Sequence, residues 1–592
     1  MSVHGLGRGS GAWGNVRVWA PAAERVSVVV DDHEHDMFRS TSVEGWWDGY
    51  VSQVTHGTDY AFRVDGGPPR PDPRGLWQPQ GVHGPTRYYD HDKYQWHDHN
   101  WRGVPLPGSV LYELHIGTFT TEGTFDAAIE RLDHLVELGI DVVELLPVAA
   151  FDGTHGWGYD GVALYAVHEP YGGPDGLKRF VDACHVRGLG VVLDVVYNHL
   201  GPSGNYLSEF GPYFTETHST PWGQAINLDA PGSDEVRAWI LDNATSWLRD
   251  FHFDGLRLDA VHALVDTRAV HILEELAVEV EVAATHVRRP LFLIAESDLN
   301  DPRIVRGREA GGYGLDAQWA DDVHHAMHSA LTGERHGYYV DFGSLETLAE
   351  SMSRVFVHAD TVSTFRGRHH GRPFDPSLTP GFRFVTYLQN HDQVGNRATG
   401  DRPSVTLSPG LLKIGAALLL CSAYTPMLFM GEEWGATTPW MFFTSFPQKD
   451  LADAVREGRR REFAAHGWDA DDVPDPQDPA TFERSRIDWA ELNKEPHLEI
   501  FEWYRQLISL RRQRWQLSDA RLDRVRCEYD EDARWFVLYR EGLAVAANFA
   551  SERQAVPLTG APSGVLLASA GRFVFGPGVI ELEPESVAIV PL

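Results

Sequence analysis

The chain of 592 residues is 43% hydrophobic and 23% charged, a mixture that excludes a globally disordered protein. Its 51 Lys and Arg residues stand against 84 Asp and Glu, so the formal net charge is −33. This charge argues against nucleic acid and anionic membranes as partners, because their phosphates are repelled. The N-terminus lacks the apolar segment of a signal peptide and no apolar run is long enough for a membrane span. We therefore expect a cytoplasmic protein.

The first segment of the chain has the pattern of a β-sandwich. Apolar and polar residues alternate between Asn15 and Val64, and Pro, Gly and Asp interrupt the alternation at intervals typical of turns. A stretch rich in Pro and Gly follows at 66–81, which indicates a packed linker. We predict an immunoglobulin-like N-terminal β-sandwich over residues 1–92.

From Val110 onward, short apolar runs alternate with segments of helical periodicity, as in βα units around a parallel sheet. Eight such strands over about four hundred residues predict a (β/α)8 TIM barrel, which we assign to residues 93–515. The predicted strands are Val110–Ile116, Val142–Leu146, Val191–Val196, Gly255–Leu258, Leu291–Ala295, Leu315–Trp319, Phe384–Leu388 and Met427–Met430. Predicted helices lie between them, for example at Phe125–Leu138, Gly176–Arg187, Glu235–Phe251 and Leu411–Cys421.

Long loop insertions interrupt the predicted barrel at 199–231, 333–381 and 434–494. Loops at the C-terminal ends of barrel strands are where such folds build their sites. Strand-like alternation returns after the last barrel helix. We predict a C-terminal antiparallel β domain over residues 516–592, so the fold class is multidomain α/β.

Four short motifs stand at predicted strand ends: DVVYNH at 194–199, DGLRLDAVH at 254–262, LFLIAES at 291–297 and LQNHDQVGNR at 388–397. In a parallel barrel the C-terminal ends of all strands meet at one mouth. The carboxylates Asp259, Glu296 and Asp392 should therefore converge there, although they are far apart in the sequence.

Convergent carboxylates in this arrangement fit retaining glycoside hydrolysis, which needs one ionised nucleophile and one protonated acid. Arg257 points to the same face of its strand as Asp259 and should keep it ionised. Glu296 ends an apolar strand, so desolvation should raise its pKa and keep it protonated. Asp392, beside His391, could bind hydroxyls of a distorted sugar ring. A single carboxylate of this kind would more simply be a cap or an ion-pair partner.

With all four motifs in order, the sequence resembles the α-amylase superfamily of α-glucan enzymes, over essentially the whole chain. The resemblance implies that Asp259 is the nucleophile, Glu296 the general acid/base and Asp392 the stabiliser of the transition state. It also implies an N-terminal module of the glucan-binding type and no required metal or other cofactor. The implied sugar-binding residues at the cleavage position are Tyr159, His199, Arg257, Asn390 and His391.

Longer stretches, among them WGYDGVALYAVHEPYGGPDGLKRFVDACH, LIAESDLNDPR and LQNHDQVGNRATGDR, resemble one branch of the superfamily more closely. Its enzymes cleave the α-1,4 bond next to the terminal trehalose of malto-oligosyltrehalose and release trehalose. The partners implied are malto-oligosyltrehalose, maltooligosaccharides and, functionally, the enzyme that makes the substrate. We expect the leaving-group side to be lined by Trp222, Asp321, Asp322, His324 and His325. His262 and Gln393 are expected as further contacts to substrate hydroxyls.

Other readings stay open. An α-1,4-glucan branching enzyme would share the sandwich and the four motifs and differ only in its acceptor, and a debranching enzyme is a third possibility. A non-catalytic glucan-binding scaffold could use the same fold, although three intact carboxylates argue against it. The basic segment Arg366–Arg372 is most simply a solvated loop.

Overall fold

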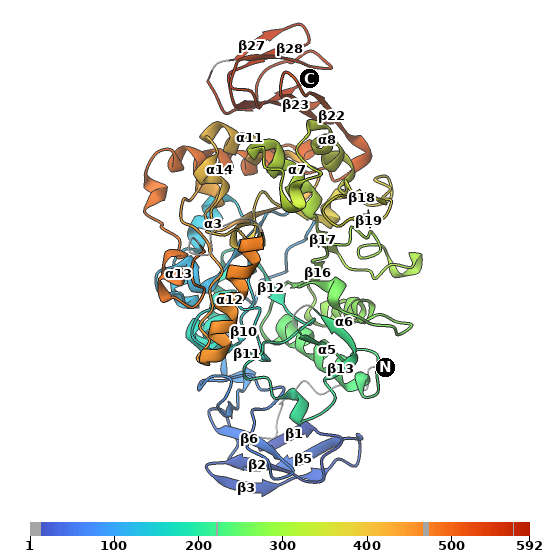
Figure 1. Ribbon diagram of the computed structural model, residues 1–592, viewed down its shortest axis with the longest axis vertical. Helices are drawn as coiled ribbons and strands as arrows, with labels where there is room; N and C mark the ends of the chain where they lie inside the picture. Colours follow the sequence, from blue (N-terminus) through green and yellow to red (C-terminus); the bar gives the residue numbers. More distant parts are fainter. Residues whose placement is uncertain (1–13, 221–222, 466–472, 572) are drawn as a thin grey trace.

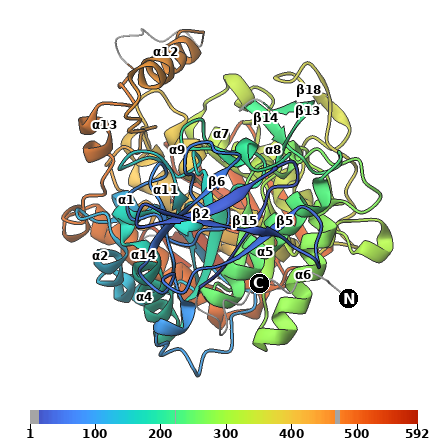
Figure 2. The ribbon, with the colours of Figure 1, turned by 90° about the horizontal axis from the view of Figure 1, so that it is seen from below.

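The computed structural model describes residues 14–220, 223–465, 473–571 and 573–592. Figure 1 shows three parts along the long axis, with the N-terminal and C-terminal sheets at opposite ends and the barrel between them. Viewed from below in Figure 2, the N-terminal strands lie across the end of the barrel. Among the described helices, none has the length and apolar character needed to cross a membrane.

The N-terminal part consists of two small antiparallel sheets that bury the apolar side of their strands against each other, including Val26, Val28 and Phe62. This arrangement confirms the predicted sandwich. One sheet has the order β1 (Asn15–Trp19), β5 (Trp46–Tyr50), β4 (Phe38–Arg39), and the other β3 (His33–Asp36), β2 (Val26–Val30), β6 (Asp59–Val64), β7 (Thr86–Arg87).

The central part is a closed barrel of eight parallel strands in the order β12-β15-β16-β17-β20-β21-β8-β9. All eight predicted strands are confirmed, with ends that differ by up to two residues. Nearly every strand residue is buried, because helices cover the outside and side chains fill the inside. The strands are β8 (Leu111–Leu114), β9 (Val142–Leu145), β12 (Gly190–Val195), β15 (Gly255–Leu258), β16 (Phe292–Ala295), β17 (Ala317–Trp319), β20 (Phe384–Thr386) and β21 (Thr425–Phe429).

Helices pack around the barrel, and one predicted helix differs from the observed one. The segment predicted as Phe125–Leu138 is divided into α2 (Phe125–Ile129) and α3 (Leu132–Leu138). At the division, the N–H groups of Glu130 and Arg131 bond to carbonyls three residues back, which tightens the turn. The other main barrel helices are α4 (Gly173–Val186), α5 (Ser233–Asp250), α6 (Ile272–Val287), α7 (Asp321–Thr332), α11 (Pro409–Cys421) and α14 (His497–Gln513).

The predicted insertions contain regular structure of their own. The first holds the hairpin β13 (Phe214–Thr220) and β14 (Gly223–Ile226). The second holds α8 (Leu345–Arg354) and the hairpin β18 (Thr361–Ser363) and β19 (Arg368–His370). The third holds α12 (Lys449–Ala465) and α13 (Pro479–Arg484).

The C-terminal part is formed by two antiparallel sheets, which confirms the predicted β domain. The almost wholly apolar helix α11 lies against it and contacts β24 and β29. The sheets have the orders β22 (Val525–Asp530), β23 (Trp535–Arg540), β24 (Leu543–Asn548), β29 (Ser586–Pro591), β26 (Leu567–Ala568) and β25 (Gln554–Pro557), β28 (Val579–Leu582), β27 (Phe573–Gly576).

A buried ionic cluster closes the N-terminal end of the barrel, opposite the mouth. Asp254, just before β15, is fully buried and its oxygens accept from Trp101 Nε1 (2.8 Å), Arg289 Nη1 (3.0 Å) and His185 Nε2 (2.9 Å). The other nitrogen of His185 lies 2.8 Å from Asp98. The cluster connects the segment before the barrel with α4 and β15.

Candidate active site

Asp259 and Glu296 lie side by side at the mouth of the barrel. Each follows its strand directly, and β15 pairs with β16 so that Leu258 is opposite Ala295. The Arg257 guanidinium lies between the two carboxyls, with Nη1 3.0 Å from Asp259 Oδ1 and Nη2 3.1 Å from Glu296 Oε2. One guanidinium therefore reaches both groups, which fits the short carboxyl separation of a retaining site.

The two carboxyls have different environments. Asp259 accepts hydrogen bonds from Arg257 Nη1 at 3.0 Å and from Asn198 Nδ2 at 2.9 Å. Burial raises the pKa of Glu296 well above its ordinary value, and the negative charges of Asp259 and Asp392 add to this, against the opposing effect of Arg257. The structure thus places a carboxyl held by two donors beside a carboxyl whose environment favours the protonated form, an arrangement that suits glycoside cleavage.

A second layer fixes Arg257 from below. Both oxygens of Asp194 contact Arg257 Nη1, at 2.7 and 2.8 Å, and the Tyr159 hydroxyl donates to Asp194 at 2.6 Å. Burial raises the pKa of Asp194 to about 7, although Arg257 opposes the shift. The guanidinium also lies 4.1 Å from the ring centre of Trp319. These contacts leave Arg257 little freedom to turn away from the catalytic carboxyls.

Asp392 lies on the short helix α9 (His391–Gly395), which follows β20. Its side chain is 37% exposed, and its Oδ2 lies 3.5 Å from His391 Nε2. His391 is buried and stacks on Tyr159 with ring centres 5.2 Å apart. Asn390 caps the helix by accepting from the Gln393 N–H at 2.8 Å, so its side chain has a structural bond in addition to any contact with sugar.

Two further predicted substrate contacts, His199 and His262, also lie near Asp259. His199 lies with Nε2 3.0 Å from the Tyr159 carbonyl and Nδ1 2.5 Å from Asn198 Oδ1. His262, in the turn after Asp259, lies 3.9 Å from Asp298. Trp222 lies outside the described residues.

The four predicted residues of α7 do not all face the mouth. Asp321 accepts from the Tyr387 hydroxyl. Burial raises the pKa of Asp321 to about 6 against the effect of this hydrogen bond, and the charges of Asp392 and Asp322 add to the shift. Asp322 instead turns inward, where its Oδ2 accepts from Asn300 Nδ2 and from the N–H groups of Val357 and His358. The Asp322 carboxylate therefore anchors a loop, which differs from the substrate contact we expected.

The two predicted histidines of α7 differ in exposure, since His324 is buried and His325 is only partly buried. His324 Nε2 lies 2.9 Å from the Tyr339 hydroxyl. His325 packs among Tyr338 and Phe342, with ring centres 4.9 and 5.0 Å away. Burial lowers the pKa of His325 to about 3, so this ring is neutral. In the structure described, both rings support the wall of the site from behind.

Three functional candidates were missed by the sequence reasoning. Glu113 of β8 binds His391 from inside the barrel. Arg366, at the tip of the β18–β19 hairpin, lies 3.0 Å from Asp298, two residues beyond Glu296. The segment that we interpreted as a solvated loop thus reaches the site. Asp298 could have been found from the sequence, because it stands two residues beyond Glu296. No local sequence pattern pointed to Glu113 or Arg366.

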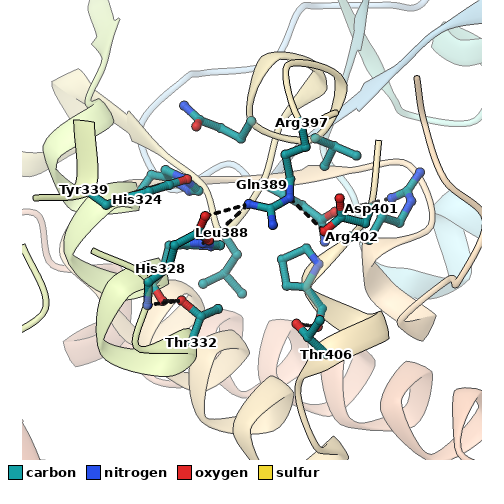
Figure 3. Close-up of a pocket in the computed structure, with 14 residues that line it drawn as sticks. His324, His328, Thr332, Tyr339, Leu388, Gln389, Arg397, Asp401, Arg402 and Thr406 are labelled. Atoms are coloured by element: carbon teal, nitrogen blue, oxygen red, sulfur yellow. Dashed lines mark hydrogen bonds and ion pairs between the residues drawn. The ribbon is translucent and has the colours of Figure 1, made fainter. Parts of the chain in front are cut away.

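A cavity of about 190 Å³ lies next to α9, between α7 and the segment after β20 (Figure 3). His324 and Gln393 line it, and Arg397 crosses it to pair with Glu334 (3.1 Å) and Asp401 (2.8 Å). The carboxylates Asp259, Glu296 and Asp392 are not among the described residues that line it. Within the described parts of the chain, no group of His, Cys, Asp or Glu side chains is arranged to hold a metal ion.

Comparisons with known protein families agree with this architecture. The family described as alpha amylase, catalytic domain, matches residues 84–220. Carbohydrate-binding module 48 (isoamylase N-terminal domain) matches 6–75, and a domain of unknown function, DUF3459, matches 520–589. A crystal structure of an alpha-amylase-type protein from Salmonella typhimurium superposes with a TM-score of 0.88 at 37% identity, covering 98% of this chain and 100% of that one. The chain is a glycoside hydrolase with the α-amylase fold.

Full-length relatives narrow the family further. The malto-oligosyltrehalose trehalohydrolase of Arthrobacter ramosus is 54% identical, over 96% of this chain and 99% of the relative. A 1,4-alpha-glucan branching enzyme from Thiobacillus denitrificans is only 32% identical, over 77% of this chain and 65% of the relative. The chain belongs to the malto-oligosyltrehalose trehalohydrolase family.

Proposed function

We propose that this protein hydrolyses the α-1,4-glucosidic bond next to the terminal trehalose of malto-oligosyltrehalose, with retention of configuration, and releases trehalose. The single observation that carries the chemistry is the Arg257 guanidinium between Asp259 and Glu296. The family relationship carries the choice of substrate.

In the first step Glu296 donates its proton to the glycosidic oxygen, which leaves with the trehalose unit, while Asp259 Oδ attacks the anomeric carbon. The product is a β-glycosyl ester on Asp259. In the second step a water molecule attacks the same carbon, Glu296 takes its proton, and the Asp259 carboxylate is released. Asp392 and His391 bind hydroxyls of the ring as it flattens toward the oxocarbenium-like state.

The leaving-group side is the part of the mouth beyond Glu296. Asp298, Arg366 and His262 form a connected polar edge there, with the Arg366–Asp298 ion pair at 3.0 Å. A site built around fixed hydrogen bonds to a disaccharide rejects analogues that lack those hydroxyls. We propose that this edge and Asp321 bind trehalose, with Gln393 and Trp222 as further contacts.

The finer context of the protein is also part of the proposal. It acts in trehalose biosynthesis in the cytoplasm, and it depends functionally on the enzyme that makes malto-oligosyltrehalose. Its domains are 1–92, 93–515 and 516–592.

The test is product analysis with two substrates. The protein is incubated separately with maltopentaosyltrehalose and with maltoheptaose, and the sugars are resolved by chromatography. Fast trehalose release from the first and slow attack on the second is the expected result. New α-1,6 branches without free trehalose would instead identify a branching enzyme, and no reaction with either sugar would revive the scaffold reading.

A further inference from the structure

Two glutamates occupy paired positions inside the barrel. Glu113 of β8 is opposite Glu144 of β9 in the strand register, and each residue is 1% exposed. Glu113 accepts two bonds from His391, from the backbone N–H at 3.0 Å and from Nδ1 at 2.5 Å. Neither oxygen of Glu144 has a hydrogen-bond partner among the described residues. Two identical side chains in neighbouring positions therefore have opposite environments.

The hydrogen bonds around His391 define its protonation. The Tyr159 hydroxyl has one proton, which it donates to Asp194. At His391 Nε2, 2.8 Å away, the same oxygen must then accept, so Nε2 carries a proton. A carboxylate faces Nδ1, so Nδ1 carries a proton as well. With Asp194 and Glu113 both ionised, counting donors and acceptors makes His391 a doubly protonated imidazolium.

From this geometry we propose that Glu113 is a positioning residue for the reaction. It holds His391 as an imidazolium in one orientation, so that Nε2–H is directed toward Tyr159, Asp392 and the sugar at the cleavage position. Glu113 acts through His391 and does not itself touch substrate. The proposal rests on the proposed function for its substrate, whereas the pairing of Glu113 with His391 does not depend on it.

The other charged and titratable groups around His391 are compatible with this assignment. Burial lowers the pKa of His391, but Asp392 and then Glu113 raise it, against Arg257, to about 9. Burial raises the pKa of Glu144 well above its ordinary value, so this carboxyl is neutral and adds no second negative charge. Burial lowers the pKa of His115 to about 3, so it adds no positive charge. The groups facing His391 are Glu113 (β8), His115, Glu144 (β9), Tyr159, Asp194 (β12), Arg257 (β15) and Asp392 (α9).

The experiment compares Glu113→Gln with Glu144→Gln, the same change at the paired position. The kcat/KM for maltopentaosyltrehalose is measured from pH 5 to pH 8.5 and divided by the wild-type value at each pH, which cancels effects common to both enzymes. For Glu113→Gln we expect a ratio that falls at least about tenfold as pH rises through roughly 6.5, because the imidazole then titrates near its ordinary value. For Glu144→Gln, which replaces a neutral group by a neutral group, we expect a ratio within about twofold of one at every pH.

If the kcat/KM ratio of Glu113→Gln is lowered by the same factor at every pH, Glu113 only supports packing. If the ratio of Glu144→Gln falls with pH as steeply as that of Glu113→Gln, the two glutamates do not differ in their effect on His391. Either result overturns the proposal. If Glu113→Gln fails to fold, neutron diffraction of the wild type decides: deuterium on both ring nitrogens of His391 supports the proposal, and deuterium on one contradicts it. Trehalose release by the wild type tests the proposed function separately, since the ratios can be measured with any glucan that is cleaved.

Discussion

Asp254 and Asp259 flank the same four-residue strand, β15, and face opposite ends of the barrel. Asp254 has 0% of its surface exposed, and its oxygens accept from Trp101, His185, Arg289 and the Val191 N–H. The Asp259 side chain is 11% exposed and is held by Arg257 and Asn198. The residue type is the same, but one carboxylate is enclosed by protein donors and the other faces the mouth.

The difference shows how one barrel separates stability from chemistry. At the base, every charge has opposite charge and hydrogen bonds around it, so the cluster joins segments that are distant in the chain. At the mouth, Arg257 holds the carboxyls of Asp259 and Glu296 in place but leaves some of their oxygen atoms available to substrate. This division is typical of barrel enzymes. Their active sites occupy the C-terminal face, whereas the N-terminal face contributes to stability.

The largest effect should come from removing Asp259, the proposed nucleophile at the mouth. We expect Asp259→Asn to lower kcat by about 10⁴-fold or more, since loss of a covalent nucleophile removes the main path. Its thermal unfolding temperature should stay within a few degrees of the wild type. The assay is the initial rate of trehalose release, and a variant that keeps more than a tenth of the wild-type rate would contradict the assignment of Asp259.

The matched substitution at the base should act on stability instead. Asp254→Asn leaves Arg289 buried without its carboxylate and leaves His185 with Asp98 alone, a change that costs about 3–5 kcal/mol. We expect a lower midpoint of urea unfolding and, at low temperature, unchanged kcat for the molecules that remain folded. If Asp254→Asn lost activity while its unfolding midpoint stayed the same, the separation between the two ends would be wrong.

The pH dependence of stability should sharpen the comparison. Asp254 and Asp98 raise the pKa of His185 against the effect of burial, so its contribution is complete below about pH 6.5 and is lost as pH rises through the higher folded-state pKa. Bonds from His185 and His252 lower the pKa of Asp98 despite its burial, so its contribution is present above about pH 4 and is lost at lower pH. The stability difference between wild type and His185→Gln, measured by urea unfolding, should therefore be large at pH 6 and shrink toward alkaline pH. A stability difference between wild type and His185→Gln that grows as pH rises would contradict this prediction.

The smallest effect should come from the rim of the mouth. The Arg366–Asp298 pair is partly exposed, at 27% and 35% of the side chains, so it should contribute at most about 1 kcal/mol. We expect Arg366→Ala to raise KM for maltopentaosyltrehalose about two- to fivefold with little change for maltoheptaose. Arg368→Ala in the same hairpin is the control, because within the described parts of the chain the Arg368 side chain donates to the neighbouring His369 carbonyl. Equal effects of the two substitutions would remove Arg366 from the leaving-group side.

The sequence allowed prediction of those parts of the molecule that local patterns determine. Apolar runs located all eight barrel strands, and strand ends located Asp259 and Glu296, whose adjacency then followed from the parallel register. The direction of α7 was not predictable in this way. Helical spacing groups Asp322 and His325 with Asp321, but only packing decides which of them faces the mouth.

Long-range partners were the other part that sequence reasoning could not supply. Glu113 meets His391 across 278 positions of the chain, and Asp98 meets His185 and His252 at the base. These pairs depend on barrel closure and on the path of the segment before the barrel. No spacing rule connects such residues until the strand order is known.

The position of Arg366 has a consequence for how this family can diversify. The hairpin that carries it belongs to an insertion and contributes no strand to the barrel. Mutations can therefore change the length or the charge of the hairpin without altering Asp259, Glu296 or Arg257. With Arg366 in its proposed role, preference for the departing sugar can change separately from the capacity to break the bond.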